Sequence, residues 1–281
     1  MTSNLAIYTD HFGLTERPFT LLPDPDFLYW SDNHTRAYSM LEYGMLTHAP
    51  ITVITGEIGA GKTTLLRHLL RTLPEEFTVG LISNAQGNRG ELLHWVLMAL
   101  GVPTDTGASY VQLFAQFQDF LIEEYASGRR TMLIFDEAQN LSTETLEELR
   151  MFSNINADKD ELIQIVLVGQ PELRDLIAQP QLTQFSQRVA AEYHLPGMSA
   201  EQVEAYINHR LSVAGATREI FTPAACECVH RASRGVPRLV NQICDYALVY
   251  AFTDGRDLID AGVVEQVVTD RRMHGNLKLV G

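Results

Sequence analysis

Hydrophobic and polar positions follow two periods along most of the chain. Short apolar runs rich in β-branched residues indicate buried strands, and apolar positions three and four residues apart indicate helices with one buried face. The runs predict strands at 51–55, 77–83, 130–135, 162–169 and 188–195. The helical spacing predicts helices near 62–72, 89–100, 109–126, 143–151 and 171–178. Strands joined by helices favour an α/β fold with a parallel sheet covered on both faces.

From Ser199 onward the strand pattern stops and only helical patterns follow. Ser199 and Gln202 have the spacing of a capping box, which predicts a helix from there to about residue 214. Thr222 and Pro223 predict a second helix start, because they place a capping hydroxyl before proline at the first helical position. Further helices are predicted at 236–252 and 260–270. The expected organisation is an N-terminal strap with a first helix at 1–50, an α/β domain at 51–197 and an all-helical domain at 198–281.

The first predicted strand leads into a glycine-rich turn and then a helix. The turn fits G-x-x-x-x-G-K-[ST], the pattern of a phosphate-binding P-loop, and this context argues against a chance match. Its glycines let backbone N–H groups curl around phosphates, and the helix N-terminus adds partial positive charge. Lys62 would reach the β and γ phosphates, and Thr63 would offer its hydroxyl to magnesium. The nucleotide-binding candidates are Gly56, Glu57, Ile58, Gly59, Ala60, Gly61, Lys62, Thr63 and Thr64.

The third predicted strand ends in two adjacent carboxylates, Asp136 and Glu137. Such a pair means little alone, but about 70 residues after a P-loop it indicates a Walker B motif and hydrolysis rather than binding only. Asp136 would hold the magnesium shell, and Glu137 would orient or deprotonate the attacking water. Gln139 and Asn140, which follow, could relay the nucleotide state to a partner or could only terminate the strand.

Charge and hydropathy limit the partners. The net charge is −14, with 25 acidic and 12 basic residues in 1–194 and 10 and 9 in 195–281. A duplex-binding surface needs a block of Lys and Arg, so nucleic acid is disfavoured as the main partner, although a local basic patch formed by the fold is not excluded.

No apolar run approaches about 18 residues, and the N-terminus lacks the features of a signal peptide. We therefore expect no transmembrane segment and a cytoplasmic location.

Cys226, Cys228 and His230, with Cys244 further along, raise the alternative of a zinc site. On a helix only positions 226 and 230 share a face, so these three side chains could not all reach one metal. An odd number of clustered cysteines does not suggest a disulfide framework either. Buried structural thiols are the expected outcome.

The order of these motifs resembles that of the AAA+ ATPases, in which a sensor, an arginine finger and a helical lid follow Walker A and Walker B. The resemblance implies that ATP and Mg²⁺ are the cofactors. It also implies roles for three residues. Gln170, which follows an apolar strand, would be the first sensor, although many members carry Asn, Ser or Thr there. Arg188 would be the finger that reaches a neighbouring subunit, and Arg238, in Gly-Val-Pro-Arg, would be a lid sensor that contacts the nucleotide in cis. Taken alone, either arginine would be read as a solvated surface residue.

Four further segments carry a narrower resemblance, to the ExeA/GspA family of secretion ATPases, over nearly all of the chain. They read FGLTERPF at 12–19, PDPDFLY at 23–29, FDEAQNL at 135–141 and VGQPEL at 168–173. Related proteins serve pilus biogenesis (the MshM type) or accompany exosortase and exopolysaccharide systems. The resemblance implies an ATPase that forms a ring or nucleotide-dependent homo-oligomer and acts with protein partners of an envelope secretion, pilus or export system. A partner would recruit it to the inner membrane.

Secretion members of that family typically continue into a membrane span and a peptidoglycan-binding domain. The sequence given ends at Gly281, so those parts are missing or were removed, and we expect one of the shorter, cytoplasmic relatives. Two rivals stay open: a DNA-transaction ATPase of the transposition-regulator or loader kind, and a nucleotide-gated scaffold that hydrolyses too slowly to act as a motor.

The N-terminal segment has prolines at 18, 23 and 25, which prevent a regular helix, and aromatic residues that supply apolar anchors. We expect a strap packed on the α/β domain. The alternatives are an arm that docks on a partner and a border of the adenine pocket.

Overall fold

The computed structural model describes residues 8–21, 27, 29–83, 91–105, 107–157 and 160–273. They form two compact units. One consists of residues 34–57 and 61–195, and the other combines residues 1–33 and 58–60 with 196–281. Along the chain, the last change from one unit to the other falls between Leu195 and Pro196.

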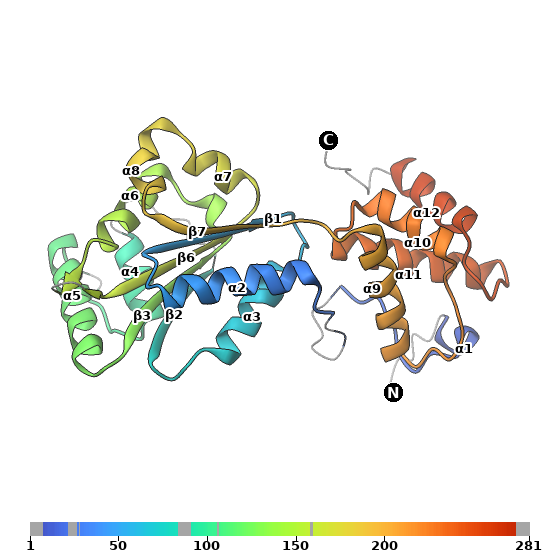
Figure 1. The fold of residues 1–281 in the computed structure, drawn as a ribbon, viewed down its shortest axis with the longest axis horizontal. Helices are drawn as coiled ribbons and strands as arrows, with labels where there is room; N and C mark the ends of the chain where they lie inside the picture. The colour runs from blue at the N-terminus through green and yellow to red at the C-terminus, as the bar shows by residue number, and fades with distance from the viewer. Residues whose placement is uncertain are drawn as a thin grey trace. The chain divides into compact units, whose positions relative to one another are not determined.

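The first unit is built on a five-stranded parallel sheet with the order β2-β3-β6-β1-β7 (Figure 1). The strands form because β-branched and other apolar residues fill both faces of the central three, so a continuous apolar run is their signature. The sequence predicts all five to within a residue or so at each end. They are β1 (Ile51–Gly56), β2 (Phe77–Ser83), β3 (Arg130–Asp136), β6 (Ile163–Gly169) and β7 (Val189–Leu195).

Helices cover both faces of this sheet, as expected for parallel strands (Figure 1). Thr52 and Gln164 face α2, whose Gly44 carbonyl accepts a hydrogen bond from the Gln164 amide. Val53 and Ile165 point the other way, into a core shared with α4, α5, α6 and α8. The helices of this unit are α2 (Asp32–Leu46), α3 (Lys62–Thr72), α4 (Glu91–Ala99), α5 (Tyr110–Ala126), α6 (Thr143–Phe152), α7 (Glu172–Ile177) and α8 (Thr183–Ser186).

Several short elements are absent from the sequence prediction because they span too few residues to show a period. They are the antiparallel pair β4 (Asn156–Ala157) and β5 (Asp160–Glu161), the 3-10 turns η2 (Ala138–Asn140) and η3 (Pro180–Leu182), and α8. Of these, η2 bears on the site described below.

The second unit is helical, as predicted, and its two predicted caps are present. The Ser199 hydroxyl accepts the Gln202 N–H, and the Gln202 side chain accepts the Ser199 N–H in return. The Thr222 hydroxyl accepts the Ala225 N–H at 3.2 Å. The helices are α1 (Thr9–Phe12), α9 (Ala200–Val213), α10 (Pro223–Ser233), α11 (Pro237–Thr253) and α12 (Ala261–Met273). No helix among the described residues is both long and apolar enough to cross a membrane.

The N-terminal strap corrects one expectation, because it packs within the helical unit and not on the α/β domain. Phe12, Phe19 and Phe27 are buried in the core that α9 to α12 form. Both apolar packing and a hydrogen bond hold the strap in this unit. Arg210 donates from Nε to the Pro18 carbonyl at 2.5 Å, and so satisfies a strap carbonyl that has no strand partner.

Candidate active site

The glycine-rich turn predicted to bind phosphate follows β1 at the carboxyl edge of the sheet. Gly59 and Gly61 have φ of 82° and 103°, in the left-handed region that glycine adopts without strain. Gly61 is also the N-cap of α3, and a Cβ added to it would lie 2.5 Å from Nε2 of His34. Both the backbone angle and the space therefore require glycine at position 61. Of the other turn candidates, Ile58 is exposed, Ala60 is buried and Thr64 lies in the first turn of α3.

Lys62 is held inside this turn and is only 7% exposed. Its Nζ donates to the carbonyl oxygens of Gly56, at 2.6 Å, and Glu57, at 2.9 Å. Burial lowers the pKa of the ammonium group, while the nearby carboxylates Glu137 and Asp136 act in the opposite direction. A buried ammonium held by two neutral carbonyls fits a phosphate ligand, because phosphate oxygens would supply the missing countercharge.

Asp136 and Glu137 lie at the end of β3, at the same edge of the sheet. Burial raises the pKa of the Asp136 carboxyl group, whose Oδ1 accepts the Glu137 backbone N–H at 2.9 Å. Glu137 has φ of 56°, which is uncommon for a residue with a side chain and is found at functional sites. A carboxylate here, with the hydroxyl of the exposed Thr63 on α3, offers the hard oxygen ligands that Mg²⁺ prefers.

Gln170 follows β6 and is brought to Glu137. Its Nε2 donates to Glu137 Oε2 at 3.2 Å. A second amide, that of Gln139 in η2, donates to the same oxygen at 2.7 Å. These hydrogen bonds, that from Gln139 foremost, hold the pKa of Glu137 below its ordinary value. The contact between Gln139 and Glu137 cannot be derived from the sequence. The only signal there is that Gln139 follows closely after the carboxylate pair.

Arg188 is not brought to the phosphate turn of its own unit. It precedes β7, in which Val189 pairs with Ile51 and Leu195 pairs with Gly56, so it lies at the opposite edge of the sheet. At about 3.3 Å per residue, the length of the strand puts roughly 20 Å between the two edges. There Arg188 donates to Asn154 and lies 3.8 Å from Glu161. The finger role therefore stays a prediction that requires a second chain.

Arg238 lies in the first turn of α11 in the helical unit, to which residues 58–60 also belong. Its backbone N–H donates to the Gly59 carbonyl at 3.3 Å. A Cβ on Gly59 would collide with the Cβ of Arg238, so this close approach also requires glycine. Contact between the guanidinium group and a nucleotide stays a prediction.

The three cysteines are free and buried. Burial raises the pKa of all three thiols, that of Cys226 to about 12. Thiols that resist ionisation make poor metal ligands and poor nucleophiles. Among the residues that the structure describes, no group of three or more His, Cys, Asp or Glu residues is arranged to hold a metal ion.

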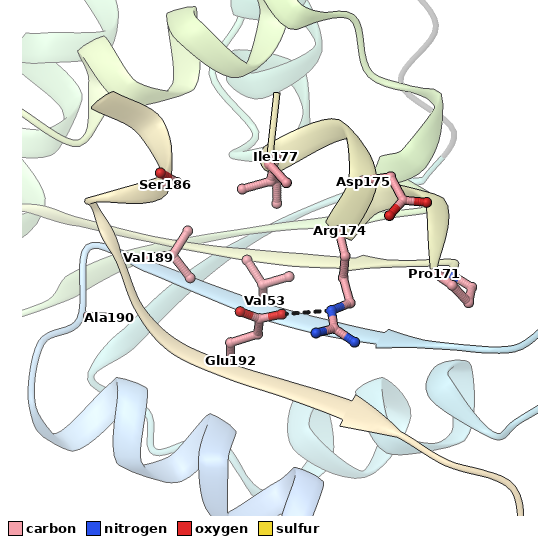
Figure 2. A pocket seen from close by; sticks show the side chains of 10 residues that line it. Val53, Pro171, Arg174, Asp175, Ile177, Ser186, Val189, Ala190 and Glu192 are labelled. Carbon is pink, nitrogen blue, oxygen red and sulfur yellow. Dashed lines mark ion pairs between the residues drawn. The ribbon is translucent and has the colours of Figure 1, made fainter. Parts of the chain in front are cut away.

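A separate hollow of about 700 Å³ lies between α7 and β7 (Figure 2). An ion pair between Arg174 and Glu192, with 3.1 Å between Nε and Oε1, crosses it, and Val53, Ile177 and Val189 supply its apolar wall. Both charged side chains are about half exposed, so water screens the pair. The described lining includes no residue of the phosphate-binding turn.

Comparisons with known proteins agree with this geometry. A family model described as an AAA domain matches residues 45–177. General secretion pathway protein A of Aeromonas hydrophila is 42% identical over 256 residues, which make up 91% of this chain. The same match covers 47% of that protein, so the chain spans about half the length of this curated relative.

Solved structures share the fold at low identity. Drosophila ORC bound to DNA matches with a TM-score of 0.69 and 17% identity, over 98% of this chain and 69% of that chain. Cdc6p from Pyrobaculum aerophilum matches with a TM-score of 0.65 and 18% identity, over 89% of this chain and 71% of that one. At such identities the likeness concerns the fold alone.

The parallel sheet, the glycine-rich turn with its buried lysine and the following helical unit place this chain in the AAA+ class of P-loop ATPases. Within that class the chain is an ExeA/GspA-like AAA ATPase, similar to general secretion pathway protein A. The fold class and the family resemblance expected from the sequence are thus confirmed.

Proposed function

We propose that this chain binds ATP with Mg²⁺ and hydrolyses it to ADP and phosphate. The observation that carries the proposal is the convergence of Lys62, Asp136 and Glu137 at the carboxyl edge of one parallel sheet. The ammonium group is buried without a hydrogen-bonded anion among the described residues, and both carboxylates contribute to its electrostatic surroundings. This is the arrangement that phosphoryl transfer uses, since it depends on positioning and charge stabilisation.

Each residue would have a distinct task. The turn at 56–64 and Lys62 would hold the phosphates, while Thr63 and Asp136 would hold Mg²⁺, which neutralises phosphate charge when bound. Glu137 would take the proton of the attacking water. Gln170 would position that carboxylate, and Arg238 would contact the nucleotide in cis.

The wider role is also a proposal. The chains would assemble as a ring or nucleotide-dependent oligomer, with Arg188 of one chain acting at the site of the next. The ATPase cycle would drive assembly or regulation of a bacterial envelope secretion, pilus or exopolysaccharide export system. Support comes from the name of the 42% identical relative. We further propose a cytoplasmic location with recruitment to the inner membrane by a partner.

Two substitutions test the site. Lys62→Ala should abolish ATP binding, measured by titration of a fluorescent ATP analogue, because it removes the countercharge of the phosphates. Glu137→Gln should bind ATP normally but lose turnover by about a hundredfold or more, because an amide cannot accept the proton. Substantial phosphate release by Glu137→Gln would reject this residue as the base.

A DNA-transaction ATPase is the rival that shares this fold. The acidic balance of the chain argues against it, because a duplex-binding surface needs Lys and Arg. Adding duplex DNA to the turnover assay separates the two. Stimulation that weakens steeply with salt would favour the rival, and an unchanged rate would favour the envelope role.

A further inference from the structure

One side chain beside the proposed base has contacts that the proposed function leaves unused. Gln139 lies between Glu137 and Gln170. Its Nε2 donates to Glu137 Oε2 at 2.7 Å, and its Oε1 accepts the backbone N–H of Gln170 at 2.9 Å. A backbone N–H can only donate, so the oxygen end of the Gln139 amide must face Gln170. The NH₂ end must then face the carboxylate, which gives the amide a single orientation.

The surrounding backbone is shaped to admit this side chain. Gly169 ends β6, and a Cβ added there would lie 2.9 Å from Gln139 Oε1 and 3.2 Å from the Gln139 backbone nitrogen. On the other side, η2 is closed by a hydrogen bond from the Asn140 N–H to the Glu137 carbonyl at 3.0 Å. Gln139 is therefore fixed by β6 on one side and by the turn after Glu137 on the other.

Both amide donors converge on one carboxylate oxygen. Gln170 Nε2 and Gln139 Nε2 donate to Oε2 of Glu137, and neither donates to Oε1. A carboxylate anchored through one oxygen keeps the other available for a water molecule. We propose that Gln139 is a positioning residue for ATP hydrolysis, which anchors Glu137 through Oε2, leaves Oε1 to accept the proton of water, and ties the base to the backbone at the end of β6.

This inference rests on the proposed function, because it assigns Gln139 to the same reaction. The donor end of the Gln139 amide faces Glu137, and its acceptor end faces the Gln170 N–H. A glutamate at position 139 would keep an acceptor for that N–H but would lose the donor to Glu137.

The experiment compares Gln139→Ala and Gln139→Glu with Gln181→Ala, a glutamine elsewhere in the same unit that bonds to Gln179. Steady-state kcat, KM and ATP affinity would be measured for each. Gln139→Ala should lower kcat by about tenfold with ATP affinity unchanged, because only the positioning of the base is lost. Gln139→Glu should lower kcat at least as much, because a carboxylate keeps an acceptor for the Gln170 N–H but offers Glu137 no donor. Gln181→Ala should match the wild type.

A kcat at the wild-type level in Gln139→Glu would overturn the inference, since it would show that the donor to Glu137 is not needed. A loss of ATP affinity in Gln139→Ala as large as its loss of kcat would also overturn it, since that would indicate a general disruption of the site. Failure of the proposed function shows separately, as turnover that survives in Glu137→Gln.

Discussion

At the scale of single residues, the site sets two neighbouring carboxyl groups in different environments. Burial raises the pKa of Asp136, whereas amide donors lower the pKa of Glu137. Two carboxyl groups whose pKa values move in opposite directions are suited to different tasks. A bound cation would stabilise the charged form of the buried carboxyl group, and the carboxyl group that stays ionised can accept a proton. This contrast supports Asp136 as a ligand of Mg²⁺ and Glu137 as the base.

A glycine substitution tests the turn at this scale. Gly61→Ala should lower ATP affinity and stability, because alanine would strain the backbone and crowd His34. Gly128→Ala is the matched control: its φ is 75°, but an added Cβ would meet nothing within 4 Å. The control should lose about 1 kcal/mol from the left-handed backbone alone and bind ATP normally. Equal ATP affinity in the two variants would contradict this account of Gly61.

What the sequence could predict of the site depends on how far apart the partners lie in the chain. Lys62, Asp136 and Glu137 could be named because each sits at a known place in a local motif beside a predicted strand. The role of Gln139 could not, because its orientation is set by a backbone N–H 31 residues further along. The place of Arg188 likewise follows only from the register of β7 against β1.

At the scale of elements, strands and long helices were predictable because each buries an apolar face with its own period. The β4–β5 pair, η2 and α8 were not, since their few residues leave no period to read. The strap shows a different limit. Its aromatic residues signal burial, but which surface buries them depends on the partners of its carbonyl groups, such as Arg210.

Arg210 gives the prediction at this scale. It is 6% exposed, donates to the Pro18 carbonyl and to the Tyr206 hydroxyl, and lies over the ring of Phe27. Arg210→Ala should destabilise the helical unit by about 3 kcal/mol. It leaves the buried Pro18 carbonyl and Tyr206 hydroxyl without this donor, and it removes the packing of the arginine side chain.

Urea unfolding and protease cleavage of the strap would measure the effect of Arg210→Ala, with Arg256→Ala as the control. Among the described residues, the side chain of Arg256 makes only exposed ion pairs, at 3.7 Å and 3.6 Å, and its loss should cost less than about 1 kcal/mol. An equal loss in the free energy of unfolding in the two variants would show that Arg210 does not anchor the strap.

At the scale of the whole molecule, one chain holds the proposed site and Arg188, the proposed finger, at opposite edges of the same sheet. The turn at 56–64 follows the carboxyl end of β1, and Arg188 precedes β7 at the amino end. A rigid parallel sheet cannot bring the two together, so a finger at position 188 must act on another chain. The account therefore predicts an ATPase whose active site is completed between chains.

The variant Arg188→Ala separates the finger from the rest of the site. It should bind ATP as the wild type does but lose most turnover, because transition-state charge is no longer neutralised. Mixing it with Lys62→Ala should restore part of the activity, since mixed assemblies pair an intact turn with an intact arginine. Arg174→Ala, which removes an exposed ion pair in the same unit, should keep full turnover. Undiminished turnover by Arg188→Ala would reject the finger.

The most direct measurement is phosphate release from Mg²⁺-ATP per chain, followed over a rising concentration of the wild-type protein. Specific activity should climb with concentration as chains assemble, and Glu137→Gln should show none at any concentration. A specific activity that is substantial and constant down to the concentration at which the protein is monomeric would contradict a site completed between chains.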